Sequence, residues 1–207
     1  LLAKDKWRTL SVNVHKLRTQ QSQDKVLLSE VDETFHLDFD LTSSEQYLIL
    51  TTSDSDRTEV SVVNMADLSQ APKMLNTREQ NFKLEVDHGN GHFYMLTNDS
   101  HVNFRIAKTK ENLLHPDQWQ TVFAGSDTKY FKALQVFKDF VAIGQSIQGV
   151  ESIRILPNGG ASHQISLPEN VASVSLGANP EFSQKHVRIR YESMITPDSI
   201  YDYDVTN

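Results

Sequence analysis

Apolar and polar residues alternate along most of this chain, most plainly from Phe35 to Leu41, where the odd-numbered positions are apolar and the even-numbered ones polar. A period of two puts one face of a β-strand in a core and the other in water. Lys110–Gln118 alone hints at a helical turn. The same alternation predicts further strands at Leu10–Leu17, Lys25–Val31, Tyr47–Thr52, Glu59–Met65, Lys83–Asp87, His92–Thr97, Val102–Lys108, Gln120–Ala124, Lys132–Phe137, Phe140–Gly144, Glu151–Leu156, His163–Leu167, Ala172–Leu176, Val187–Tyr191 and Ser199–Val205.

The strands recur in similar units. FHLDFD at Phe35–Asp40 is matched 47 positions later by FKLEVD at Phe82–Asp87, and each is followed by an apolar strand, a polar turn and another alternating strand. A third unit begins near Phe131 and a fourth near Ala172. Aromatic residues recur at equivalent points and are predicted to pack between the units: Phe35, Phe39, Phe82, Phe93, Phe131 and Phe140.

Units of about 40–50 residues with four strands each are typical of propeller blades. The sequence therefore predicts an all-β fold, a partial β-propeller of four-stranded antiparallel blades with about four and a half blades. The predicted divisions are a partial blade at 1–32, blades at 33–80, 81–127 and 128–170, and an incomplete blade at 171–207. An ordinary β-sandwich, whose short strands are also regularly spaced, is the alternative fold.

Composition narrows the possible partners. The formal net charge is −7 and Lys and Arg are not clustered, which argues against nucleic acid, because that affinity rests on basic patches. No apolar run approaches the length of a membrane-spanning helix, so no membrane partner is predicted. The absence of cysteine excludes disulfides, thiolate metal sites and cysteine nucleophiles.

No catalytic residue, metal site or cofactor is predicted. Gly144–Gly149 only approaches the Gly-x-Ser-x-Gly nucleophile motif, because its second glycine is one position late and a strand follows, so Ser146 is predicted to belong to a hairpin. His88 and His92 have a spacing that suits zinc on a helix, but glycines lie between them. The Asp54–Asp56 turn lacks the glycine and distal glutamate of a calcium loop.

Matched acidic positions give the one candidate binding surface. Asp38 and Glu85 are 47 residues apart, as are Asp40 and Asp87. The first strand of a propeller blade is the innermost, so these carboxylates could face a central channel and attract cationic peptides. The alternative is a solvated strand face without a ligand, and the third and fourth units do not repeat the acids.

Several runs resemble the propeller of the prolyl oligopeptidase family of serine peptidases, and most closely that of oligopeptidase B (protease II). The residues that carry the resemblance are His92–Asn98 with Asn103–Ile106, the stretch from Trp119 to Asp139, and Tyr191–Met194 with Thr196-Pro197 and Tyr201–Asp204. One departure is visible at Gln145–Gly149, where family members often carry an acid–Arg pair. The resemblance therefore gives no salt bridge at that position.

In that family the propeller precedes an α/β-hydrolase domain and admits only short peptides to its serine, and oligopeptidase B cleaves after Lys or Arg. The resemblance implies that this chain is an excised, non-catalytic, substrate-gating portion of such a peptidase. It implies a hydrolase domain of the same parent chain as partner and short basic peptides as the parent's substrates. It also implies a cytoplasmic location, with the periplasm as the alternative.

Two other functions are considered. A self-standing propeller scaffold that binds a protein partner is the main alternative, although the units lack Trp-Asp and double-glycine signatures. A complete small hydrolase would need a nucleophile elbow. The unpaired strand Ser199–Val205 also predicts self-association of the chain, by edge pairing or by exchange of Leu10–Leu17.

Overall fold

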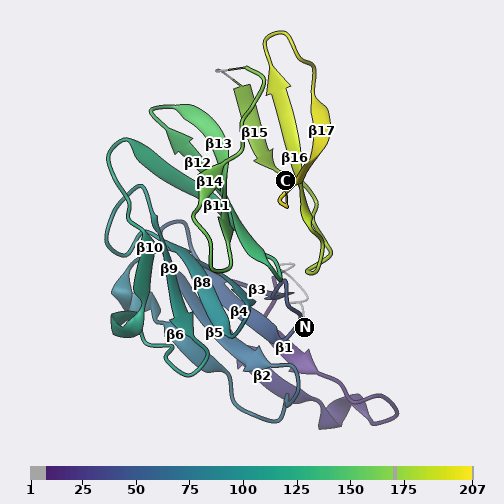
Figure 1. Cartoon of the computed structure of the whole chain (residues 1–207). Coiled ribbons are helices and arrows are strands. Elements are labelled where there is room, and N and C mark those ends of the chain that lie inside the picture. The colour runs from purple at the N-terminus through teal and green to yellow at the C-terminus, as the bar shows by residue number, and fades with distance from the viewer. Residues whose placement is uncertain (1–7, 170–171, 207) are drawn as a thin grey trace.

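The computed structural model describes residues 8–169 and 172–206. They form five antiparallel sheets, which we number 1 to 5 in chain order, and Figure 1 shows these sheets following one another through the molecule. Sheet 1 is the hairpin of β1 (Ser11–Val14) and β2 (Lys25–Ser29). Sheet 2 contains β3 (His36–Leu41), β4 (Tyr47–Ser53), β5 (Thr58–Asn64) and β6 (Lys73–Asn76). Sheet 3 contains β7 (Leu84–Gly89), β8 (His92–Thr97), β9 (Arg105–Lys110) and β10 (Gln120–Phe123).

Sheet 4 contains β11 (Lys129–Val136), β12 (Phe140–Ile147), β13 (Val150–Pro157) and β14 (His163–Gln164). Sheet 5 contains β15 (Ala172–Leu176), β16 (His186–Ser193) and β17 (Ser199–Asp204). In the described residues, three short 3₁₀ helices lie between strands, at Gln21–Gln23, Arg78–Gln80 and Pro116–Gln118. Only the last of these falls in the stretch 110–118 that hinted at a helical turn. The all-β prediction is confirmed.

Within each sheet of the described residues, strands that follow one another in sequence pair antiparallel, and the tightest connections are two-residue turns. Asn90 and Gly91 join β7 to β8 with φ angles of 55° and 72°, and Gln148 and Gly149 join β12 to β13 with 50° and 86°. Two consecutive residues at positive φ match the twist of a tight hairpin, and glycine accepts this conformation without strain.

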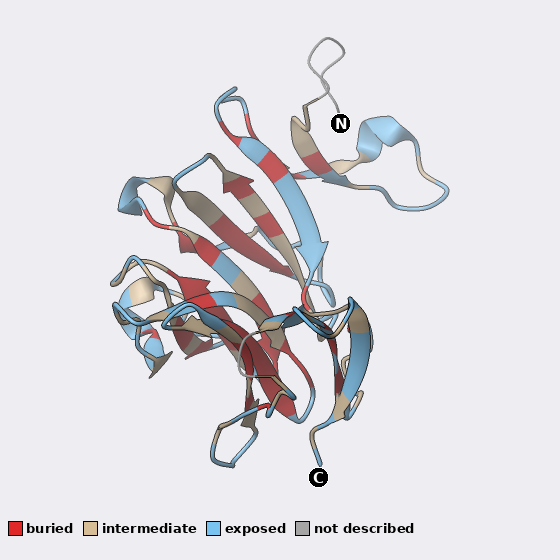
Figure 2. Ribbon diagram, turned by 90° about the horizontal axis from the view of Figure 1, so that it is seen from above, coloured by how far each residue is buried: buried red, intermediate tan, exposed pale blue. Residues whose placement is uncertain are grey.

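The hydrophobic core is divided among the junctions between consecutive sheets, which Figure 2 shows as facing red segments. At the junction of sheets 2 and 3, Val60 and Val62 meet Phe93 and Met95. Burial of each such large side chain contributes about 1.5–3 kcal/mol. Five sheets in succession, each packed on the next, are a blade arrangement rather than the two-layer sandwich.

Hydrogen bonds to the first strands of sheets 3, 4 and 5 reinforce the junctions with the preceding sheets. The Leu84 amide of β7 donates to Thr58 Oγ1 over 2.7 Å, and the Val174 amide of β15 donates to Glu151 Oε2 over 3.1 Å. The Phe131 amide of β11 donates to the Asn103 carbonyl over 3.2 Å. In each case the third strand of one sheet, or the turn just before it, supplies an acceptor to the first strand of the next sheet.

The alternating pattern predicted a core position for one aromatic residue that is exposed in the structure. Phe39 is 56% exposed, whereas Phe35, Phe82, Phe93, Phe131 and Phe140 are buried. The hairpin of sheet 1 packs Val12 and Leu27 against Leu37 of β3, and Phe39 lies outside that cluster. Alternation correctly put Phe39 on the same face as Leu37, but sheet 1 does not extend over it.

β17 forms one edge of sheet 5, and no strand of the described part of the chain pairs with its outer side. Such an edge is a template for another chain. Self-association through this strand stays a prediction, which sedimentation velocity on the purified chain tests, with a strict monomer at high concentration as the contrary result. Within residues 8–169 and 172–206, no helix has the length and apolar character needed to cross a membrane.

Candidate functional site

The first strands of consecutive sheets converge, and their free edges form the candidate site. β3, β7, β11 and β15 each lie at one edge of their own sheet. The carboxylate of Asp87, on β7, reaches both Ser43, which follows β3, and Val136 at the end of β11. The first strands of sheets 2, 3 and 4 therefore come within hydrogen-bond distance of one node.

Asp38 and Asp40 lie on β3 with exposed side chains. Asp38 Oδ1 accepts a hydrogen bond from the Phe39 amide over 2.8 Å, and Asp40 Oδ1 accepts one from the Leu41 amide over 2.7 Å. These carboxylates thus satisfy amides on the edge of β3 that has no strand partner in the described structure. Both remain in contact with water, where they can meet a cationic ligand.

Glu85 occupies the equivalent place to Asp38, on β7, and its side chain is also exposed. The surrounding protein nevertheless raises the pKa of Glu85 by desolvation. A carboxylate on a concave surface is expected to contact water and still have many protein atoms nearby, as Glu85 does. Glu85 is therefore an acid whose charge a cationic neighbour would stabilise.

Asp87 is placed differently from the other three predicted residues, because it is only 9% exposed. Its Oδ1 accepts hydrogen bonds from the amides of Ser43 and His88, over 2.7 and 2.8 Å. Its Oδ2 accepts from Ser43 Oγ and the Val136 amide, both over 2.7 Å. Burial raises the pKa of Asp87, while the four donors favour its ionised form. Asp87 ties three sheets together, so we leave it out of the surface that could meet a ligand.

A serine–histidine–acid chain that sequence reasoning missed lies beside Asp87. Ser44 Oγ is 2.8 Å from His88 Nδ1, and His88 Nε2 is 2.9 Å from Glu111 Oε1. The imidazole is fully buried, with the rings of Tyr47 and Phe93 at 4.7 and 4.8 Å. Buried from solvent on every side, His88 could not pass a proton to a bound substrate, so this chain of groups is structural.

One signal in the sequence could have drawn attention to it. In the 47-residue repeat, His88 takes the place of Leu41, so a polar residue replaces an apolar one. Its partners Ser44 and Glu111 lie in turns that carry no motif. The substitution marks the position, but only the packing of sheets 2 and 3 supplies the partners.

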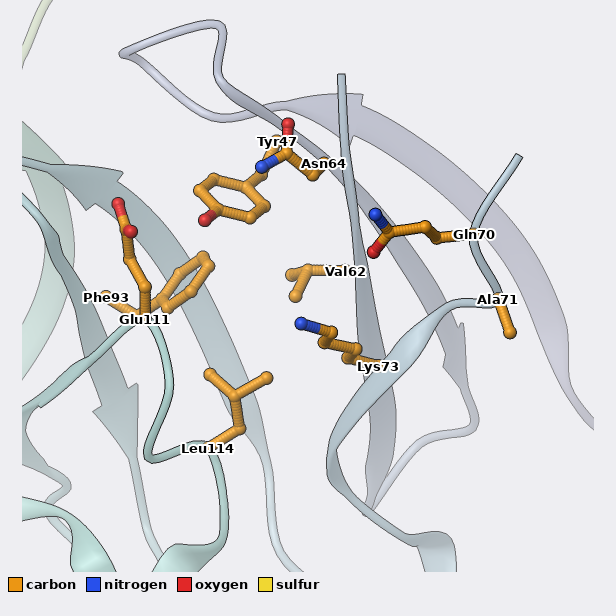
Figure 3. A pocket seen from close by; sticks show the side chains of 9 residues that line it. All are labelled: Tyr47, Val62, Asn64, Gln70, Ala71, Lys73, Phe93, Glu111 and Leu114. Atoms are coloured by element: carbon orange, nitrogen blue, oxygen red, sulfur yellow. The ribbon is translucent and has the colours of Figure 1, made fainter. Parts of the chain in front are cut away.

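A small pocket opens on the solvent side of Glu111 and Tyr47 (Figure 3). Its volume is about 50 Å³, enough for a few water molecules at most and too small for a peptide side chain with its backbone. Burial and the Glu111 carboxylate raise the pKa of Tyr47. The lining residues are Tyr47, Val62, Asn64, Gln70, Ala71, Lys73, Phe93, Glu111 and Leu114.

The other residues weighed from the sequence are separate from one another. Ser146 lies inside β12, opposite Glu151, and no helix follows it. Asp54 binds the Arg57 side chain over 2.8 Å, which together with turn amides lowers the pKa of Asp54 to about 2. Among the described residues, no group of three or more histidine and carboxylate side chains is arranged to hold a metal ion.

Comparison with known proteins identifies the family. The family model for the prolyl oligopeptidase N-terminal β-propeller domain matches residues 4–207. The chain belongs to the prolyl oligopeptidase family. The structure of oligopeptidase B from Trypanosoma brucei with covalently bound antipain superposes with a TM-score of 0.86, at 21% identity over 97% of this chain and 30% of that one. Oligopeptidase B from Leishmania major gives the same TM-score at 17% identity, again over 97% of this chain and 30% of that one.

Two curated relatives are similar in sequence over most of the chain. Dipeptidyl aminopeptidase BI of Pseudoxanthomonas mexicana is 24% identical over 92% of this chain and 26% of its own length. Protease 2 of Moraxella lacunata is 22% identical over 90% of this chain and 27% of its own length. The chain therefore spans about a quarter of the length of these relatives.

The departure from the family pattern at Gln145 has a clear structural outcome. Gln145 is buried on β12, and its amide donates to Ser152 Oγ over 3.3 Å. Arg154 donates to Gln145 Oε1 over 3.5 Å and to Ser162 Oγ over 3.0 Å. Arg154 therefore meets a neutral amide at Gln145.

Proposed function

We propose that this chain is a non-catalytic part of the propeller of a serine oligopeptidase, and that it filters the peptides that reach the catalytic serine. The observation that carries the proposal is the set of exposed carboxylates on the first strands, Asp38, Asp40 and Glu85. Membership of the family, whose relatives are named as peptidases, supports it.

The filter would act in two ways. In a propeller whose first strands converge on one node, as these do at Asp87, the passage along those strands would exclude folded proteins by size. Three acids on two neighbouring first strands give that passage a negative potential, which raises the local concentration of cationic peptides. The expected substrates are short peptides cleaved after Lys or Arg, and the expected partner is an α/β-hydrolase domain of the same parent chain.

Charge neutralisation in the full-length protein tests the proposal. The variant D38N/D40N/E85Q is expected to lower kcat/KM for a dibasic peptide about three- to tenfold at low salt, because exposed charges accelerate the encounter with an oppositely charged ligand. The difference should nearly vanish at about 1 M salt, where the Debye length falls to about 3 Å. A neutral peptide serves as the reference substrate.

The matched control changes the same number of charges elsewhere. Asp56, Asp117 and Asp127 are exposed acids outside the strands, so D56N/D117N/D127N should leave the rate for the dibasic peptide within about twofold of the parent at the same salt. Equal effects of the two triple variants, or an effect of the first-strand variant that persists at high salt, would favour a solvated strand face without a role in substrate entry.

A further inference from the structure

His88 lies at the junction between sheets 2 and 3, and each nitrogen of its buried ring contacts a different sheet. Ser44, in the β3–β4 turn of sheet 2, contacts Nδ1 over 2.8 Å. Glu111, directly after β9 of sheet 3, contacts Nε2 over 2.9 Å. Tyr47 of sheet 2 and Phe93 of sheet 3 cover the ring.

The surroundings favour a neutral imidazole. The ring has no exposed surface, so a positive charge there would lose its hydration. This burial lowers the pKa of His88, against the opposing influence of Glu111 and Asp87 and with a smaller contribution from His92. In the neutral ring, Nε2–H donates to Glu111 and Nδ1 accepts the Ser44 hydroxyl proton, so both nitrogens are satisfied.

The charged and titratable groups that face the ring come from every element around it. Glu111 and Asp87 carry negative charge, and the Tyr47 hydroxyl adds a neutral group whose pKa is raised. His92, on β8, is the nearest second imidazole. Glu111 is the one of these that forms a hydrogen bond with the ring, and 39% of its side chain is exposed.

We propose that His88 is a pH-responsive lock between sheets 2 and 3, closed while its imidazole is neutral and released in mild acid when the separated sheets let it take up a proton. The geometry that carries this proposal is a fully buried ring held between two sheets by one hydrogen bond to each and by one aromatic ring from each. The proposal is independent of any peptidase activity.

The direction of the effect follows from proton binding. When the junction opens, His88 regains an ordinary pKa of about 6.5, whereas in the closed junction its pKa is lower. Above about pH 6.5 neither state binds the proton, and junction stability does not depend on this group. As the pH falls below that value, the open state binds the proton first, so opening becomes up to about tenfold more favourable per pH unit until the closed state also binds it.

Amide hydrogen exchange of the purified chain tests the lock at the Ser43 amide, whose bond to Asp87 joins the same two sheets. Between about pH 7.5 and pH 5.5, its protection factor is expected to fall by up to about tenfold. H88Q, which keeps polar groups but cannot titrate, should abolish this dependence. H92Q, with the neighbouring imidazole removed, should respond as the parent does, and the Val174 amide at the junction of sheets 4 and 5 should not respond in any variant.

An unchanged Ser43 protection factor in the parent would overturn the proposal, and so would an equal fall in H88Q. Should H88Q not fold, an NMR titration of the parent's imidazoles decides the matter. The lock requires His88 to titrate below the ordinary histidine value of about 6.5. A midpoint for His88 at or above that value would overturn it.

Discussion

Replacing Phe93 with alanine is expected to lower the free energy of unfolding by about 3–5 kcal/mol, since the loss of a buried aromatic ring leaves a cavity. Phe93 has no exposed surface and lies 4.8 Å, ring centre to ring centre, from both Tyr47 and His88. It therefore fills the middle of the junction between sheets 2 and 3. Urea denaturation followed by circular dichroism measures the change.

Phe39 provides the matched control, because alternation predicts a core position for both residues but Phe39 is 56% exposed. F39A should cost less than about 1 kcal/mol, as is usual for surface substitutions. Similar losses for F93A and F39A would mean that Phe39 is covered in solution and that the junctions described here are incomplete.

Replacing Asp87 with asparagine is expected to cost about 2–3 kcal/mol, because the asparagine side chain offers one acceptor oxygen where the carboxylate offers two. If that oxygen faces the backbone amides of Ser43 and His88, the side-chain NH2 group faces the backbone amide of Val136. Two hydrogen-bond donors then face each other. In the other orientation of the side chain, the NH2 group faces the backbone amides of Ser43 and His88. At least one buried backbone amide loses its acceptor either way.

The control for Asp87 is Asp40, which stands 47 residues earlier in the repeat. Asp40 is exposed, and its carboxylate accepts a hydrogen bond from the Leu41 amide. D40N should therefore change the free energy of unfolding by less than about 0.5 kcal/mol. The same denaturation measurement applies to both variants. An equal response of D87N and D40N would show that Asp87 does not hold the three sheets together.

The strands were predictable because their signal is local. Alternation in Phe35–Leu41 depends only on which face of one strand is buried, and β3 spans His36–Leu41. Tight turns are equally local where their residue types favour positive φ, as in Asn90-Gly91. The repeat of such units then indicated blades.

The contacts between sheets were not predictable, because they depend on which elements meet. Asp40 and Asp87 have equivalent places in the repeat, yet one is exposed and the other buried, since a third sheet reaches Asp87 through Val136. The acceptors that join first strands to the preceding sheet differ in type, from the Thr58 hydroxyl to the Glu151 carboxylate. A shared role filled by different residues leaves no motif in the sequence.

Photo-crosslinking of a short dibasic peptide to the full-length protein tests most directly whether substrates pass along the first strands. The account predicts that the label falls on β3 and β7, around Asp38, Asp40 and Glu85, and that unlabelled dibasic peptide competes it away. Labelling confined to the outer strands β6, β10 and β14, or labelling of β3 and β7 that no competitor reduces, would contradict the account.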